Sequence, residues 1–512
     1  MLHNPMLGGL LARDPREVML VDAHSGRRLE VGAFLDEVAR CAGALARRGV
    51  GRGDRVAITL RATAEFVTVV YACLPLGAVP ALFDPAMPPE VAGQGLERLS
   101  VALWVTAEGH ETGAAAAREL FEGPARVAPP VAVGTEHPCL IIHTSGTTGP
   151  PKPVVWTCSN VASYLDQQRL LYGDCRLATE FVVLPFLGLM DAALGRTLVL
   201  PDLGDAEPGL ADIQAAHRQM TALGCDYTFA SLAFWRRLAS HCRDHRLPLP
   251  PVRVATVSGA PASPRVVEDL LRALPQTRID VHYSSTEAPM PLAVVEARQL
   301  AALAESAARR GRGVPVGTAQ DTRIAILPLD ATDVREFEDS DELPAGGIGE
   351  IVVAGPRVSR EYARWPQLTA RAKLRHRDGS LWHRMGDVGY LDADGMLWFL
   401  CRRKHLIHTS HGLVYPDQQE FTYNQRLGLT QCALIAVPDD GLFLVVPADE
   451  QRAAPADQVH AIALHLGWSL AHPVAYPGRL PVDHRHSTKI DRPALAAWLT
   501  GTTTTVHGRP RT

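Results

Sequence analysis

The sequence lacks the features that mark membrane, secreted and nucleic-acid-binding proteins. Its longest apolar stretch, residues 66–83, is broken by Pro75 and Gly77 and is too short to span a bilayer. Its 51 basic and 55 acidic residues leave a formal charge of −4, without the basic excess typical of nucleic-acid partners. Residues 1–16 do not have the basic, apolar and small-residue order of a signal peptide. We therefore expect a cytoplasmic protein.

Cysteine pairs are also lacking. The nine cysteines are scattered and odd in number, and neither a CxxC pair nor an HExxH motif occurs. This usage predicts buried, reduced thiols rather than a disulfide framework or a structural zinc site. The 46% apolar and 21% charged residues are typical of a globular protein. Because single cores stop growing at about 250–300 residues, 512 residues predict two or more domains.

Helical and strand patterns alternate through the first two thirds of the chain, which predicts parallel sheets covered by helices. The predicted strands are 55–60, 79–83, 140–143, 181–184, 227–229 and 253–257, and the predicted helices are 33–48, 65–74, 211–223, 232–241 and 264–274. Short strands at 349–354, 389–392 and 396–400 then predict a small antiparallel subdomain. The expected class is mixed α/β and α+β, with a large domain at 1–403, a small mobile α+β domain at 404–499 and a disordered tail at 500–512.

The strongest local signal is a glycine- and hydroxyl-rich segment after an apolar strand. It reads His143-Thr144-Ser145-Gly146-Thr147-Thr148-Gly149-Pro150-Pro151-Lys152. The glycines allow a positive φ, so that backbone N–H groups can face an anion, and Lys152 adds a charge for phosphate oxygens. A Walker loop has Ser or Thr directly after the lysine, and a serine-hydrolase turn has a glycine two residues before the serine; neither order occurs here. A phosphate loop is the favoured interpretation, and a polar turn is the alternative.

This segment resembles the signature loop of the AMP-forming adenylating enzymes, which include acyl-CoA synthetases, peptide-synthetase adenylation domains and luciferases. The resemblance implies that the phosphates of ATP are bound by Thr144, Ser145, Gly146, Thr147, Thr148, Gly149 and Lys152. Pro153 replaces a glycine that is usual in the family. This replacement removes a backbone donor and leaves Lys152 in place.

Two further segments resemble the family's nucleotide-binding motifs. Ser258-Gly259-Ala260-Pro261 is expected between a strand and a helix, and the resemblance implies that Gly259, Ala260 and Pro261 contact adenine. Tyr283-Ser284-Ser285-Thr286-Glu287, expected just after a strand at 278–282, resembles a Tyr-Gly-x-Thr-Glu motif. It implies adenine contacts for Tyr283 and Ser284, a phosphate contact for Thr286 and a Mg²⁺ ligand at Glu287. Alone, these segments could also be a helix cap and a loop carboxylate.

The last motifs lie in the C-terminal third. Arg384-Met385-Gly386-Asp387-Val388-Gly389-Tyr390, expected just before the antiparallel strands, resembles the family's Thr-Gly-Asp motif and implies a ribose contact for Asp387. Arg402 and Lys404 match a ribose- or phosphate-binding position and the hinge, and Lys489 matches the catalytic lysine. A turn aspartate and a surface lysine are the alternatives for single motifs. Five motifs in the family's order favour the adenylating function, which requires ATP and Mg²⁺.

One branch of the family matches further. The segments 78–87, 184–189 with Pro201-Asp202, and 481–490 resemble the β-lactone synthetases of the olefin pathway. That resemblance implies a β-hydroxy acid substrate, whose hydroxyl attacks its own adenylate to give a β-lactone. The candidate bases for this hydroxyl are His143, His486 and Asp483. The acyl pocket is expected along 186–190, 229–234 and near Pro289, although such apolar stripes are also typical of core.

Two other functions stay open. An acid:CoA ligase shares the adenylation step and differs only in the second half-reaction. A nucleotide-binding protein without turnover is suggested by Pro153, Ser284 and Cys401, which replace family glycines. A small carboxylic acid is the expected partner, and enzymes of a natural-product pathway are possible protein partners.

Overall fold

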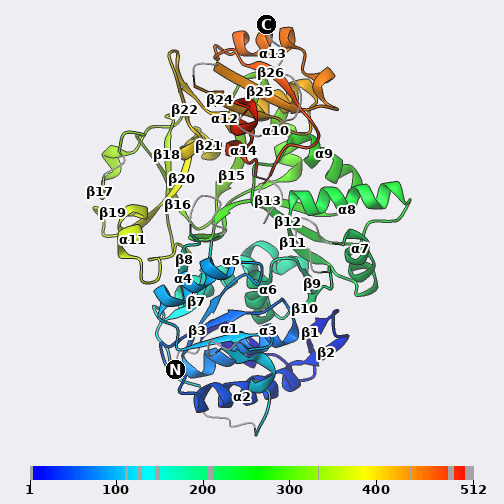
Figure 1. Cartoon of the computed structure of the whole chain (residues 1–512), viewed down its shortest axis with the longest axis vertical. Coiled ribbons are helices and arrows are strands. Elements are labelled where there is room, and N and C mark those ends of the chain that lie inside the picture. Colours follow the sequence, from blue (N-terminus) through cyan, green and yellow to red (C-terminus); the bar gives the residue numbers. More distant parts are fainter. Residues whose placement is uncertain are drawn as a thin grey trace.

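The computed structural model describes residues 4–109, 114–124, 130–144, 150–204, 212–331, 334–438, 441–482 and 489–501. Figure 1 shows the N-terminal segments at one end of the long axis and the C-terminal segments at the other, with the middle of the chain between them. The phosphate-loop residues 145–149, the segment 483–488 and most of the predicted tail lie outside the described residues.

The N-terminal part is built on a six-stranded sheet in the order β6-β5-β3-β4-β7-β8, parallel except for the last pair. Its strands are β3 (Arg55–Thr59), β4 (Val79–Leu82), β5 (Leu103–Thr106), β6 (Ala115–Ala116), β7 (Pro138–His143) and β8 (Pro153–Thr157). The helices of this region are α1 (Pro5–Leu11), α2 (Val31–Arg47), α3 (Ala64–Cys73), α4 (Pro89–Leu99), α5 (Cys158–Tyr172) and α6 (Pro185–Asp191). The predicted βα alternation is confirmed, with element ends shifted by one or two residues.

A second sheet runs through the middle of the molecule, and its first half is mainly parallel. Its strands there are β1 (Val18–Asp22), β2 (Arg27–Glu30), β9 (Thr179–Val182), β10 (Thr197–Leu200), β11 (Tyr227–Ser231), β12 (Val254–Ser258) and β13 (Arg278–Ser285). The accompanying helices are α7 (Ile213–Ala222), α8 (Leu232–Asp244), α9 (Pro264–Ala273) and α10 (Ala297–Arg309). Since β12 and β13 are parallel neighbours, the segments that follow them meet at one edge of the sheet.

The predicted antiparallel strands continue this second sheet. The strands are β14 (Ala288–Glu296), β15 (Val314–Ala319), β16 (Arg323–Leu327), β18 (Gly349–Ala354), β20 (Leu381–Leu391) and β21 (Met396–Arg402). They follow β13 in the order β14-β15-β21-β20-β18-β16. At the outer side lie β17 (Glu336–Phe337), α11 (Pro366–Ala372) and β19 (Lys373–His376), and β19 pairs with β20.

Two expectations about motif positions are wrong. Tyr283 lies inside β13, because the hairpin with β14 extends the pairing as far as Ser285 opposite Ala288. The segment 384–390 lies inside β20, because β18 and β21 pair with it from both sides. Gly386 has a φ of +67° within this strand, a value that suits glycine. The segment 258–261 begins on the last residue of β12, but α9 begins only at Pro264.

After β21 comes a short 3₁₀ helix, Arg403–His405, and then a smaller α+β unit. Its elements are β22 (Ile407–Thr409), β23 (Gly412–Val414), α12 (Pro416–Leu427), β24 (Ala433–Val437), β25 (Gly441–Pro447), α13 (Ala456–His465), β26 (His472–Tyr476) and α14 (Arg492–Leu499). Strands β24, β25 and β26 form a separate sheet with a buried cluster of its own around Leu434 and Leu444. The boundary at Lys404 stays a prediction.

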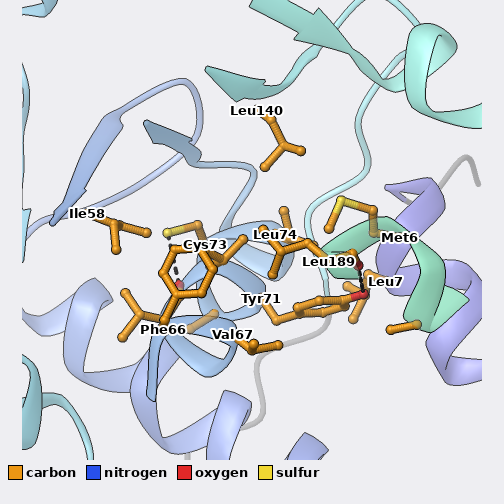
Figure 2. Packing of buried hydrophobic residues seen from close by; sticks show 14 of the residues in the cluster. Met6, Leu7, Ile58, Phe66, Val67, Tyr71, Cys73, Leu74, Leu140 and Leu189 are labelled. Atoms are coloured by element: carbon orange, nitrogen blue, oxygen red, sulfur yellow. Dashed lines mark hydrogen bonds between the residues drawn. The ribbon is translucent and has the colours of Figure 1, made fainter. Parts of the chain in front are cut away.

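The N-terminal core explains the position of α6. Figure 2 shows Tyr71 of α3 among Met6, Leu7 and Val67, with its hydroxyl directed at the backbone of Leu189. That hydroxyl donates to the Leu189 carbonyl at 2.7 Å, so α6 is fixed to α3 inside the core. The apolar residues of 187–190 therefore pack as core. All nine cysteines are unpaired and eight are buried, which confirms the predicted thiols. Among the described helices, none is both long and apolar enough to cross a bilayer.

Candidate active site

Lys152 lies where the predicted phosphate loop returns to the sheet. The backbone N–H of Thr144, just after β7, donates to the Lys152 carbonyl at 3.1 Å, and the N–H of Lys152 donates to the Thr144 hydroxyl at 3.2 Å. These bonds close the base of the loop directly after β7 and before β8. The Lys152 ammonium nitrogen lies 5.7 Å from the centre of the Tyr362 ring. The loop residues Ser145, Gly146, Thr147, Thr148 and Gly149 lie outside the described part of the chain.

Glu287 lies in the tight turn between β13 and β14, and its side chain is held by the same tyrosine. The Tyr362 hydroxyl donates to Oε1 of Glu287 at 2.6 Å. The indole N–H of Trp156, on β8, donates to the Thr286 carbonyl at 2.8 Å and fixes the turn against the first sheet. Burial and the neighbouring Glu287 raise the pKa of Tyr362, so its hydroxyl stays a donor. Lys152, Thr286 and Glu287, which are far apart in sequence, are thus brought together.

The tyrosine owes its place to a segment that pairs with β8. The N–H of Val155 donates to the Glu361 carbonyl at 3.2 Å, and the N–H of Ala363 donates to the Pro153 carbonyl at 2.8 Å. Tyr362 forms an isolated bridge with Val154 between them. Sequence reasoning missed Tyr362 because this pairing joins residues about two hundred positions apart and leaves no local pattern.

A buried lysine, Lys373, supports the segment that leads to Tyr362. Lys373 donates to both the carbonyl and the hydroxyl of Ser359, the second at 3.2 Å, and the N–H of Ser359 donates to the Glu287 carbonyl at 2.8 Å. Burial lowers the pKa of Lys373 to about 7, although the nearby Glu287 carboxylate acts in the opposite direction. Ser359 and Lys373 were also missed, because a lysine in a short strand reads as solvent-exposed.

The predicted ribose residues form a second cluster. Tyr283 donates its hydroxyl to Oδ2 of Asp387 at 2.6 Å, and Arg402 pairs with Oδ1 of Asp387 at 2.9 Å. Asp387 and Arg402 face each other on β20 and β21. Burial raises the pKa of Asp387, and the charges or hydrogen bonds of Arg402, Tyr283 and Lys489 oppose that rise. The sequence predicted Tyr283 as a stacking surface, and the structure adds a polar role for its hydroxyl.

The predicted adenine segment, residues 258–261, lies beside this cluster. Ser258, at the end of β12, has its hydroxyl 3.3 Å from that of Ser284 on β13, so the two predicted adenine motifs are in contact. Gly259 has a φ of +102°, which favours glycine and turns the chain sharply after the strand. Ala260 is partly exposed and Pro261 is exposed. Small residues here leave room beside the sheet edge.

The two C-terminal lysines also reach this region. Lys404 lies in the 3₁₀ helix after β21, and the partial burial of its ammonium, followed by the charges of Arg402 and Lys152, lowers its pKa. Lys489 is partly exposed and its positive charge acts on Asp387. Positive charges from distant parts of the chain therefore lie near Asp387 and near the tyrosine that holds Glu287. Such an arrangement suits a polyphosphate and the charge that develops during its transfer.

Of the three candidate general bases, only His143 lies among the described residues. His143 is buried, its Nδ1 lies 2.9 Å from the Leu82 carbonyl, and its ring packs on Phe83 with centroids 4.2 Å apart. These contacts are those of a packed core histidine. His486 and Asp483 lie outside the described residues.

Comparison with known proteins gives a consistent result. The family model described as AMP-binding enzyme matches residues 11–363. The olefin beta-lactone synthetases of Stenotrophomonas maltophilia and Xanthomonas campestris pv. campestris are each 34% identical over 498 residues, covering 89% of this chain and 88% of theirs. A feruloyl-CoA synthase from an Amycolatopsis species is 29% identical, covering 90% of this chain and 92% of its own.

Solved structures share the fold. MatB from Rhodopseudomonas palustris with bound ATP aligns with a TM-score of 0.78 over 98% of this chain and 99% of its own, at 19% identity. MenE from Bacillus subtilis, solved with its acyl-adenylate intermediate OSB-AMP, aligns with a TM-score of 0.75 over 99% of both chains, at 19% identity. The chain therefore has the same overall fold as these solved structures.

Proposed function

Because the chain belongs to the AMP-binding enzyme family, we propose that it makes a β-lactone from a β-hydroxy carboxylic acid, through an acyl-adenylate. Family membership establishes the first half: the chain is an enzyme that uses ATP and Mg²⁺ to activate a carboxylic acid. The second half rests on one observation, the 34% identity to olefin beta-lactone synthetases over 89% of the chain. The segment 481–490 also resembles that branch.

In the first step, a carboxylate oxygen of the acid attacks the α-phosphorus of ATP and pyrophosphate leaves. Lys152, beside Thr144, is the proposed contact of the departing phosphates, and Lys489 is the proposed cation beside the α-phosphate and the carboxylate. The Tyr283–Asp387–Arg402 cluster is the proposed ribose site, since each Asp387 oxygen can accept a second hydrogen bond.

Glu287 fits the role of a magnesium ligand. It offers hard oxygen atoms, and the Tyr362 hydroxyl occupies only one of the two. When bound, the ion supplies positive charge that neutralises the phosphates. Tyr362 and the Trp156 contact to Thr286 hold the Glu287 turn before any ligand arrives, so little reorganisation is needed.

In the second step, the β-hydroxyl oxygen attacks the acyl carbon, the bond to AMP breaks and the hydroxyl proton is lost. An intramolecular nucleophile needs no second substrate, so the reaction depends on excluding water from the adenylate. The proposed pivot at Lys404 would allow the C-terminal unit, which carries Lys489, to turn relative to the site and cover it.

The test is product analysis with β-hydroxy acids of several chain lengths, ATP and Mg²⁺, in the absence of CoA. We expect AMP, pyrophosphate and a β-lactone in equal amounts. The matched control is the same acid without its hydroxyl, which should be adenylated but give no lactone. AMP formation that requires CoA would overturn the lactone step and leave adenylation intact.

The second candidate function is an acid:CoA ligase. It is favoured by the 29% identity to feruloyl-CoA synthase over 90% of the chain. The experiment above separates the two, because an acyl-CoA thioester forms only in the presence of CoA.

A further inference from the structure

A buried ion cluster lies three residues beyond Lys489 and takes no part in the chemistry above. Arg492 begins α14, and its side chain is only 11% exposed. Both oxygens of the Glu420 carboxylate pair with its guanidinium, Oε1 with Nη1 at 2.5 Å and Oε2 with Nη2 at 3.0 Å. Asp417 lies 3.5 Å from Nη2. The two carboxylates come from α12, so the guanidinium fastens the start of α14 to that helix.

The same side chain reaches two other segments. Nη1 of Arg492 donates to the Leu434 carbonyl on β24 at 3.1 Å, and the N–H of Leu434 donates to Glu420 at 2.6 Å. Nε of Arg492 donates to Nδ1 of His405 at 3.3 Å. Burial and the neighbouring Arg492 lower the pKa of His405 to about 3, so its ring stays neutral and can accept this bond.

His405 follows Lys404 directly, at the point where the chain leaves the large domain. One guanidinium therefore joins the helix that follows Lys489 to the first residue beyond the predicted pivot. The backbone between Lys489 and Arg492 is held by hydrogen bonds as well. Ile490 pairs with Val482, and the N–H of Asp491 donates to the Pro481 carbonyl at 2.9 Å.

We propose that Arg492 is a positioning residue that fixes Lys489 relative to the pivot at Lys404. The planar fork of arginine is required, because it binds Glu420 with two parallel bonds and still reaches Leu434 and His405. With this anchor, rotation at Lys404 moves Lys489 along one defined arc. Without it, the start of α14 loses the side-chain bonds that join it to α12 and to His405. This inference rests on the proposed role of Lys489 in adenylation.

The test is a double-mutant cycle on acid-dependent exchange of pyrophosphate into ATP, which reports adenylation and needs no lactone. We expect Arg492→Lys to lower kcat by about a hundredfold, as small displacements of catalytic groups do, with KM for ATP nearly unchanged. In a Lys489→Ala background, Arg492→Lys should lower kcat by less than about twofold. The reason is that Arg492 acts through Lys489, so that its effect is lost when Lys489 is removed. Arg426→Lys, on the exposed side of α12, is the matched control and should match wild type.

Three outcomes would overturn the proposal. They are wild-type kcat in Arg492→Lys, a full additional loss in the Lys489→Ala background, and a loss confined to KM for ATP. Glu420→Gln keeps the shape of the pair and repeats the cycle if Arg492→Lys does not fold. The proposed function fails separately: in that case wild type shows no acid-dependent exchange, or Lys489→Ala exchanges at the wild-type rate.

Discussion

At the scale of single residues, the candidate site depends on polar side chains that are buried beside the turn that carries Glu287. Tyr362 and Lys373 contact the Glu287 turn directly or through Ser359, and neither belongs to a motif that the sequence displays. The charged groups come from residues of the sequence motifs. Tyr362 and Lys373, which lie outside these motifs, orient them. Substitution of Tyr362 or Lys373 should therefore change the properties of the site.

Tyr362→Phe removes the hydroxyl that donates to Glu287 and leaves the ring in place. A hydrogen bond to a charged group contributes about 1.5–3 kcal/mol, so we expect kcat/KM for ATP to fall by roughly ten- to a hundredfold. The measurement is initial rate against ATP concentration at fixed Mg²⁺. Tyr476→Phe, whose ring packs on Trp498 with centroids 5.0 Å apart, is the control. Equal kcat/KM in the two variants would show that the Glu287 turn does not need this bond.

Lys373 predicts a pH dependence of stability. Its pKa is about 7 in the fold, against an ordinary value of 10.5. Between these values the unfolded chain binds the extra proton, so the contribution of Lys373 to the free energy of unfolding rises with pH. The cost of burying its charge is present in full below pH 7 and is relieved as the pH rises.

Lys373→Met removes this titration. The difference in melting temperature, variant minus wild type, should therefore be more favourable to the variant at pH 6 than at pH 9. The lost packing and the lost contacts with Ser359 lower the stability of the variant at both pH values, so the change between the two pH values reports the titration of Lys373. Arg375→Met, at an exposed position on the same strand, serves as the control. An equal difference in melting temperature at both pH values would mean that the pKa of Lys373 is not lowered in the fold.

At the scale of elements, the site is assembled by contacts between segments that are distant in sequence. Asn160 illustrates this. Its side chain accepts from the N–H of Thr157 at 3.0 Å to complete the cap of α5, and it donates to the carbonyls of Pro356 and Val358 at 2.7 and 3.3 Å. One amide thus starts a helix and holds the segment that leads to Tyr362.

Asn160→Ala should lower stability by about 1–3 kcal/mol, because buried carbonyls lose their donor and a helix loses its cap. Activity should fall as well, since the segment that presents Tyr362 is loosened. Asp166→Ala on the same helix breaks only an exposed pair with Arg169 and should have little effect on either property. Chemical denaturation and pyrophosphate exchange measure the two effects. A variant with lost stability and full activity would show that this segment does not support the site.

At the scale of the whole molecule, periodicity predicts the sheets well and their connections poorly. The alternation between Val31 and Leu103 predicts α2, β3, α3 and β4 with nearly correct ends, because each element buries one face or lies wholly within the core. The continuity of the second sheet through β13 and β14 could not be predicted, since a strand pair depends on long-range contacts. For the same reason Tyr283 and Asp387 were placed outside their strands.

The candidate site shows the same division. The residues of the motifs, such as Lys152, Glu287 and Asp387, could be found because glycine, hydroxyl and charged residues cluster in short segments. Their supports could not, because Tyr362, Ser359 and Lys373 act through single contacts across the fold. Neither the motif residues nor the residues that support them identify the acid substrate. Only the chemistry of the product identifies it.

The most direct measurement of the central claim follows oxygen atoms in a β-hydroxy acid labelled with ¹⁸O at both carboxyl oxygens. Adenylation of the carboxylate followed by attack of the β-hydroxyl predicts one labelled oxygen in AMP and one in the β-lactone, read by mass spectrometry. Unlabelled AMP together with a lactone that carries two labelled oxygens would mean that the hydroxyl, not the carboxylate, is activated. That result would contradict the account.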